Sequence, residues 1–362
     1  MSIGDIFNDG FFISDVSDGY NNNLATYSLQ SSLESYAKTA DDLDYLYHNL
    51  YSTRQRPTQD EEDRYHGTSY AVDASNAIVH FQHFLELFIK DILLDINHLL
   101  VYNPSRKPVI LYKMIKGEPV SNNDLEGVNF IEFSEALTRI KSLHQAGEID
   151  ASLNFLSKYF EAFERINTLR NRIAHRGVFI IRHQALDEIF GRHILPFIKD
   201  LSDNVAKYRN SLKWKLNFKN TSINPFETII TEYQKPTPNP LVVYVYKLIA
   251  DAGFHNPLNY TIASFFKSFL DQKIAKAELV AGKLAEIDMF DVKECPICGC
   301  KTFIEQTDYT DEEDDEGNIV NAWTYVYSME CSQCGFHLNN WLIDKMGKLG
   351  LPIPDYYWCH KH

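Results

Sequence analysis

The sequence has few positive charges for its length and no long uninterrupted apolar run. It carries 35 Lys and Arg residues against 49 Asp and Glu residues, which gives a formal net charge of −14. A uniformly acidic chain repels phosphate backbones, so nucleic acid can bind only at a local basic patch. Every apolar run is far shorter than the roughly 20 residues of a membrane-spanning helix, so we expect no membrane partner.

Several signals of targeting and of common enzyme classes are also missing. The N-terminal segment has no basic region followed by an apolar run, so no secretory signal is visible, and we expect a soluble, cytoplasmic protein. There is no phosphate-cradling G-x-x-x-x-G-K-S/T loop, no dinucleotide fingerprint and no G-x-S-x-G elbow. These absences exclude the usual signatures of nucleotide hydrolysis and of esterase chemistry.

The composition is that of a globular protein, because 44% of the residues are apolar and 23% are charged. With 362 residues the chain is long enough for two or three domains. Apolar residues recur at three- and four-residue steps, as in amphipathic helices, over 31–53, 70–100, 131–145, 150–176, 184–212 and 241–288. The polar segment 52–69 contains Pro57 and is interpreted as a linker or loop. The sequence therefore predicts a mainly α fold built around a helical bundle.

Four consecutive segments follow from these patterns. The first is an N-terminal arm and helix over 1–69, in which residues 1–30 show no periodicity. A helical bundle over 70–212 comes next, with a linker and small helical unit over 213–290 after it. Within the third segment, the prolines of the TPNP stretch at 237–240 favour a boundary before the helical unit that begins at 241. A cysteine-containing module over 291–362 completes the chain.

Cysteine is scarce, yet four of the six cysteines form two C-x-x-C-G elements that are separated by 32 residues. Each C-x-x-C turn directs two thiolates toward one point, and the following Gly allows the backbone to turn around the sulfurs. Two such turns complete a tetrahedral site for Zn²⁺. Four thiolates leave no open coordination position, so the predicted zinc is structural. Its ligands are Cys295, Cys298, Cys331 and Cys334.

The residues between the two cysteine pairs predict a β-hairpin. Segments 301–307 and 322–329 alternate and are rich in Thr, Tyr, Val and Phe, as strands are. The acidic segment 311–316 is expected at the hairpin tip. The whole module resembles a zinc ribbon. Its acidic tip disfavours phosphate binding, so we expect a stabilising or protein-docking role.

A cluster of polar and basic residues closes the predicted helix 150–176. Asn171 and His175 are four residues apart and share a helix face, and Arg170 lies beside that face. Arg172 and Arg176 form a second pair at the same spacing. From residue 158 to residue 182 there are six Lys or Arg residues against two Glu residues. This stretch is basic within an acidic chain, as an RNA site requires.

These residue types suit RNA cleavage. RNA carries its own nucleophile, the 2′-hydroxyl, and cleavage needs an acid or base that works near neutral pH, which is the range of histidine. It also needs a cation over the phosphate, and arginine offers a forked set of donors that stays charged. Asparagine can orient either group. No metal is required for this chemistry.

The pattern Arg170-Asn171-x-x-x-His175 at the end of a late bundle helix resembles the signature of HEPN domains. The early helix, which contains Glu86 and Lys90, and the segment 131–145 resemble other helices of that family, so that the resemblance covers roughly residues 70–210. It implies a metal-independent endoribonuclease that needs no catalytic cofactor. Arg170 would hold the scissile phosphate and His175 would transfer a proton, while Asn171 positions one or both.

The resemblance also implies partners. Arg172 and Arg176 would bind RNA beside the catalytic residues. HEPN domains usually form a homodimer through the bundle, and many act as toxins or antiviral defence effectors with an antitoxin or defence-system protein as partner. The sequence thus predicts a HEPN-like helical bundle followed by a small C-terminal zinc-ribbon β-hairpin module.

Three alternatives stay open at this point. Arg and His near a helix C-terminus also oppose the helix dipole, which is a purely structural role. Some HEPN domains do not cleave RNA, so the chain could be a non-catalytic dimerising scaffold or regulatory partner. A zinc-ribbon regulator that binds DNA is a third possibility, and the acidic net charge disfavours it.

Overall fold

The structure is a computed structural model that describes residues 24–52, 58–104, 107–125, 128–177, 179–209, 212, 214–219, 224–259, 264–287, 290–313 and 319–342. Most of the predicted N-terminal arm and part of the predicted hairpin tip lie outside these residues. The chain divides into two compact units. The first unit contains Met1–Leu33, Ser75–Phe179 and Phe197–Lys213, and the second contains Glu34–Ala74, Ile180–Pro196 and Trp214–His362. Both units therefore combine distant segments, whereas the predicted domains are consecutive.

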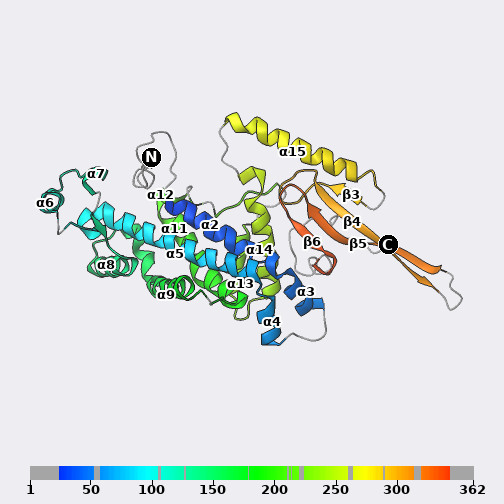
Figure 1. Ribbon diagram of the computed structural model, residues 1–362, viewed down its shortest axis with the longest axis horizontal. Coiled ribbons are helices and arrows are strands. Elements are labelled where there is room, and N and C mark those ends of the chain that lie inside the picture. The colour runs from blue at the N-terminus through cyan, green and yellow to red at the C-terminus, as the bar shows by residue number, and fades with distance from the viewer. Residues whose placement is uncertain are drawn as a thin grey trace, which may run out of the picture. The chain divides into compact units, whose positions relative to one another are not determined.

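The first unit is helical, as predicted. Its main elements are the greater part of α5 (Thr68–Ile96), α8 (Phe133–Ala146), α9 (Phe160–Arg176) and α11 (Leu195–Asn204). In Figure 1, α9 and α11 lie beside α5 within this unit. Smaller elements complete it: the first turns of α2 (Leu24–Lys38), α6 (Pro108–Lys116), α7 (Asn122–Leu125), α12 (Ala206–Arg209) and a two-stranded sheet of β1 (Tyr102–Asn103) and β2 (Asn129–Phe130).

Phe197 on α11 is the centre of the core of the first unit. Its ring lies 5.0 Å from that of Phe163 on α9 and 5.8 Å from that of Phe88 on α5, measured between centroids. Edge-to-face aromatic pairs of this kind add stability beyond the area that they bury. These contacts fix α9 against α5 and α11, which leaves the opposite face of α9 at the surface.

The predicted helix 150–176 consists of two parts. Residues Ala151–Lys158 form a 3-10 helix, which begins where the Asp150 side chain accepts a hydrogen bond from the Ser152 N–H. The α-helix α9 starts only at Phe160. It ends at Arg176, as the predicted helix 150–176 does, and is followed by Gly177, whose φ of 62° lies in the left-handed region that glycine adopts without strain.

The second unit also has a helical part. It contains η2 (Asp41–Leu43), α3 (Asp44–Ser52), α4 (Gln59–Tyr65), α10 (His183–Ile189), α13 (Pro225–Tyr233), α14 (Pro240–Phe254) and α15 (Ser264–Leu284). Helix α14 is buried around most of its girth, as the unbroken run of buried residues from Val243 to Ala250 shows. Both α13 and α14 begin with Pro after an Asn cap, so the proline-rich stretch separates two helices of one unit rather than two units.

Helix α4 corrects the interpretation of 52–69 as a loop. Thr58 and Glu61 form a capping box, in which the Thr58 side chain accepts from the Glu61 N–H and the Glu61 carboxylate accepts from the Thr58 N–H. This T-x-x-E pattern is a helix-start signal that was present in the sequence. Polar composition and Pro57 concealed it because the helix buries almost no apolar surface.

A four-stranded antiparallel sheet forms the C-terminal part of the second unit, in the order β3 (Phe290–Lys293), β4 (Phe303–Glu313), β5 (Ile319–Cys331) and β6 (His337–Asn339). The predicted hairpin corresponds to β4 and β5, which are longer than expected. Asp311 and Glu312 consequently lie within β4 and not in the tip. A membrane-crossing helix, one both long and apolar enough, does not occur in the part of the chain that the structure describes.

Candidate functional site

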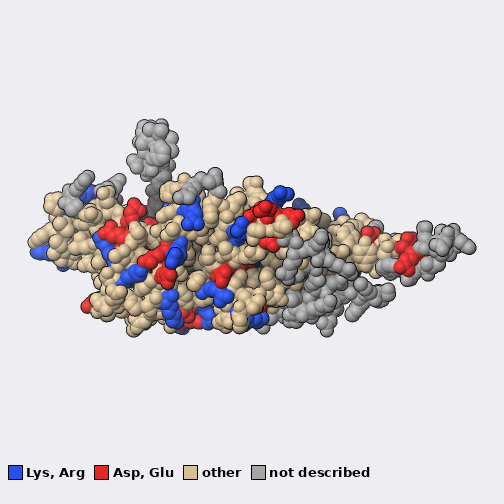
Figure 2. Space-filling view, turned by 90° about the horizontal axis from the view of Figure 1, so that it is seen from below, with Lys and Arg blue, Asp and Glu red and all other residues tan. Residues whose placement is uncertain are grey.

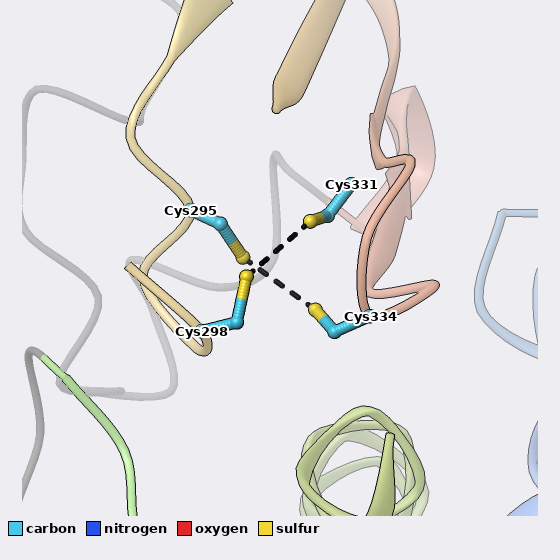
Figure 3. A group of neighbouring side chains, drawn as sticks. All are labelled: Cys295, Cys298, Cys331 and Cys334. Atoms are coloured by element: carbon cyan, nitrogen blue, oxygen red, sulfur yellow. Dashed lines mark hydrogen bonds between the residues drawn. The ribbon is translucent and has the colours of Figure 1, made fainter. Parts of the chain in front are cut away.

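The four cysteines of the two C-x-x-C elements meet in the second unit. Figure 3 shows their side chains directed toward one another from two turns. The Sγ atoms of Cys295 and Cys334 are 3.7 Å apart, and those of Cys298 and Cys331 are 3.6 Å apart. All four sulfurs lie within 4.8 Å of one another and all four residues are buried. The group could hold a metal ion.

The spacing of the sulfurs fits a tetrahedral metal. Zn–S bonds of about 2.3 Å in a regular tetrahedron place the sulfurs about 3.8 Å apart, close to the two distances found here. The sulfurs are also much too far apart for disulfides. Burial raises the pKa of the Cys295 thiol well above its usual range, because a buried thiolate without a cation is unfavourable. A divalent cation would supply the missing positive charge.

The two turns that carry the cysteines have the same backbone form. The Gly299 N–H donates to the Cys295 carbonyl and the Gly335 N–H donates to the Cys331 carbonyl, both at 2.9 Å. Gly299 and Gly335 have φ values of 73° and 75°, which other residues adopt only with strain. The glycine in each C-x-x-C-G element is therefore required by the turn, as the sequence pattern suggested.

The first cysteine turn is attached to the helical part of the second unit through one carbonyl group. The Ile297 carbonyl accepts from the Lys219 N–H at 3.2 Å and from Nδ2 of the buried Asn256 at 3.1 Å. On α15, Glu278 accepts from the Lys301 N–H at 2.9 Å. These hydrogen bonds join the cysteine module to the helices of its unit. Sequence patterns did not reveal these contacts, because none of the residues belongs to a motif.

The strand β6 is attached to the same helical part by a half-buried aspartate. Both carboxylate oxygens of Asp44 accept from Nδ2 of Asn339 at 2.9 Å, and one of them also accepts from the Tyr244 hydroxyl at 2.7 Å. The ring of Trp341 stacks on that of Tyr244. Cys300 is buried nearby but does not belong to the four-cysteine group.

The residues of the second predicted site lie at the C-terminal end of α9 in the first unit. Asn171, Arg172 and His175 are exposed and Arg170 is half-buried. The Arg170 Nη1 donates to the Asn171 Oδ1 at 3.1 Å, so the amide holds the guanidinium. The Arg170 Nε is buried and has no hydrogen-bond acceptor among the described residues. The side chain of Arg176 lies outside the described part of the structure.

The predicted basic patch is smaller than its sequence suggests, because carboxylates neutralise several of its cations. Lys158 pairs with Asp200 at 3.2 Å and Arg165 pairs with Glu161 at 3.5 Å. Figure 2, seen from the side of α8 and α9 in Figure 1, shows Lys and Arg side chains scattered among Asp and Glu. Arg170 and Arg172, by contrast, form no ion pair among the described residues.

Two further residues bear on this site. Glu86 on α5 accepts from Lys90 at 2.6 Å and from Gln82 at 3.3 Å, and it makes no hydrogen bond to Arg170 or His175 within the described residues. Phe179 belongs to no motif of the sequence, yet its ring lies under the Arg172 guanidinium, 5.1 Å from centroid to Cζ. No spacing rule for helices predicts this contact, because the chain turns at Gly177.

Comparisons with known proteins add no family to this description. No family model matches the chain, and neither a curated protein nor a solved structure matches it. The class that the fold and site define is therefore a mainly α-helical protein whose C-terminal antiparallel sheet carries a four-cysteine group able to hold a metal.

Proposed function

We propose that the first unit is a HEPN-like endoribonuclease that cleaves RNA without a catalytic metal. One observation carries the proposal: an Arg170–Asn171 hydrogen bond lies about one helical turn before the exposed His175, at a solvent-facing helix end. The charge of Arg170 supports it, since the half-buried guanidinium forms no ion pair with a carboxylate among the described residues and can bind a phosphate.

The reaction follows from the substrate. The 2′-hydroxyl oxygen attacks the adjacent phosphorus and forms a new P–O bond, and the bond to the 5′ oxygen breaks. One proton leaves the 2′-hydroxyl and one is delivered to the 5′ oxygen, so the products carry a 2′,3′-cyclic phosphate and a 5′-hydroxyl. His175 transfers a proton in this step, Arg170 stabilises the charge on the phosphate, and Asn171 fixes the guanidinium.

We further propose that the four-cysteine group binds zinc and that this zinc is structural. The all-thiolate ligand set prefers Zn²⁺ among the common divalent ions and leaves no position for substrate. The ion would hold the two C-x-x-C turns together at the base of the hairpin. It takes no part in the cleavage reaction that we propose for the first unit.

Cleavage of total RNA and of tRNA by the purified protein tests the first proposal. The buffer contains no added divalent ions, and bound zinc is measured before and after, because a chelator would also attack the cysteine site. We expect His175→Ala and Arg170→Ala to lower the rate by about 10²–10⁴-fold. Cyclic phosphate ends on the wild-type products identify the mechanism.

Two substitutions serve as matched controls. Arg165→Ala removes an exposed arginine from the same helix, and His98→Ala removes an exposed histidine from the same unit. Both should cleave as the wild type does. Full activity of His175→Ala would exclude this assignment of the residue.

The same variants separate the nuclease from a dimerising scaffold in cells. As a toxin or antiviral defence effector, the wild-type protein slows growth when expressed, and Arg170→Ala or His175→Ala relieves the effect. A scaffold affects growth equally with or without these residues. Sedimentation of the purified protein tests the proposed homodimer independently of activity.

A further inference from the structure

Arg172 and Phe179 form a paired group beside the proposed catalytic residues. The Arg172 Cζ lies 5.1 Å from the centroid of the Phe179 ring, with Arg172 exposed and the ring half-buried. Gly177, with its left-handed φ of 62°, ends α9 between them and turns the chain back. The turn brings the ring under a side chain that lies seven residues earlier in the sequence.

The surroundings of Arg172 differ from those of other arginines near it in the sequence. Arg165 pairs with Glu161, and Arg182 makes a bidentate pair with Asp63. Arg172 forms no ion pair with a carboxylate within the residues that the structure describes. An aromatic ring therefore lies on one side of the exposed Arg172 guanidinium, and no described carboxylate neutralises its charge.

We infer that Arg172, backed by Phe179, is a stacking platform for an unpaired nucleobase of the RNA substrate. This inference rests on the proposed function and specifies its substrate class as single-stranded RNA. Guanidinium planes and aromatic rings are the usual stacking surfaces for bases that have left a helix. A base inside a duplex is already stacked on both faces and cannot reach such a platform.

The position of the platform matches a nucleotide next to the one that is cut. Arg172 and His175 are three residues apart on α9, a spacing that places their Cβ atoms about 5–6 Å apart on one face. A base on Arg172 and a phosphate at His175 then belong to the same or neighbouring nucleotides. The platform selects an unpaired base at that place and orients the scissile bond.

Binding of an RNA that cannot be cut tests the inference separately from catalysis. The probe is a single-stranded oligonucleotide with 2′-fluoro riboses, together with a series in which one base at a time is removed. We expect Phe179→Leu to bind the intact strand about 10-fold more weakly, since each stacked base contributes strongly to affinity. Phe179→Tyr keeps the ring and should bind as the wild type does.

The decisive measurement is whether the effect of Phe179→Leu on binding and the effect of removing a base depend on each other. Removing the stacked base should weaken binding to the wild type about 10-fold and have no further effect on Phe179→Leu. Tyr112→Leu is the matched control, because Tyr112 is an exposed ring of the same unit that also lies under a cation, with Lys116 Nζ 4.7 Å from its centroid. It should leave binding unchanged.

Each outcome separates the platform from the nuclease. Coupling without cleavage supports the platform and contradicts the proposed function. If the protein cleaves RNA but removal of no base is coupled to Phe179→Leu, the nuclease is supported and the platform is overturned. The platform is also overturned if Phe179→Leu weakens the binding of duplex RNA as much as that of single-stranded RNA. If Phe179→Leu melted at a much lower temperature, and the wild type bound intact strands and strands lacking a base equally well, the contact between Phe179 and Arg172 would serve only to stabilise the end of α9.

Discussion

The two candidate sites differ in how their residues come together. The four cysteines arrive from two turns separated by 32 residues, and they are buried with their sulfurs within 4.8 Å of one another. Arg170, Asn171 and His175 lie within one helix, where Asn171 and His175 are exposed and Arg170 is half-buried. Any α-helix places residues four apart on one face, so the second arrangement follows from the helix alone.

This difference decides how much each site tells about function. The four thiols meet only because the second unit folds as it does. Their closeness is therefore evidence for the metal site that is separate from the C-x-x-C pattern. A shared helix face does not test the motif, because the face would exist with or without RNA chemistry. For the motif of α9, the informative observations are the Arg170–Asn171 bond and the unpaired cations.

The largest effect expected is that of removing a cysteine ligand. Cys298→Ser or Cys331→Ser should release the metal and lower the free energy of unfolding of the second unit by several kcal/mol, because metal binding and folding of such sites are coupled. Bound zinc per chain and thermal unfolding followed by circular dichroism measure the two effects. The helices should melt together with the sheet, since Asn256 and Asp44 join them.

Cys300→Ser is the control for this prediction. Cys300 is buried next to the group but is not one of its four members. It should retain one metal ion per chain. Release of the metal by Cys300→Ser to the same extent as by Cys298→Ser would contradict the assignment of the ligands.

Lowering the pH is expected to have an intermediate effect on the stability of the second unit. In the second unit, burial, together with the nearby His66 and Lys247, lowers the pKa of His183 to about 3. Because the ordinary value is 6.5, the unfolded chain takes up a proton first as the pH falls. This contribution to stability is complete above pH 6.5 and decreases toward pH 3, by at most about 1.4 kcal/mol per pH unit.

Urea unfolding between pH 7 and pH 5 measures this slope. His183→Asn keeps a group near the His66 Nε2, which lies 3.1 Å from the His183 Nδ1, and removes the titration. Its stability should depend less steeply on pH than that of the wild type, whatever the cysteine site contributes to both. Parallel slopes for the two proteins would show that His183 does not titrate in this way.

The smallest effect on stability is expected from substitutions of the proposed catalytic residues. His175→Ala should change the free energy of unfolding by less than about 0.5 kcal/mol, because the side chain is exposed. Arg170→Ala should be neutral or slightly stabilising, since it removes a buried donor that has no acceptor. Urea unfolding of both variants checks this. If either variant lost more than about 2 kcal/mol of its free energy of unfolding, the residue would have a structural role, and the contrast with the cysteine site would be weaker.

Much of the helical architecture was predictable, since periodicity reports which face of a helix is buried. The pattern in 70–100 predicted α5 because residues such as Phe81, Phe84 and Phe88 face a core. Helix α4 was missed because it has no such face, although its capping box was visible. The ion pairs that neutralise Lys158 and Arg182 could not be predicted, because their partners Asp200 and Asp63 are distant in sequence.

The sequence by itself determined the features that depend on local geometry. These are the helical periodicity, the left-handed end of α9 at Gly177, and the two cysteine turns with their glycines, all set by residues only a few positions apart. Only the tertiary structure decided which cations remain unpaired, that Phe179 lies under Arg172, and that the cysteine turns are bonded to helices through Ile297. Such contacts join residues across chain reversals, and no local pattern specifies them.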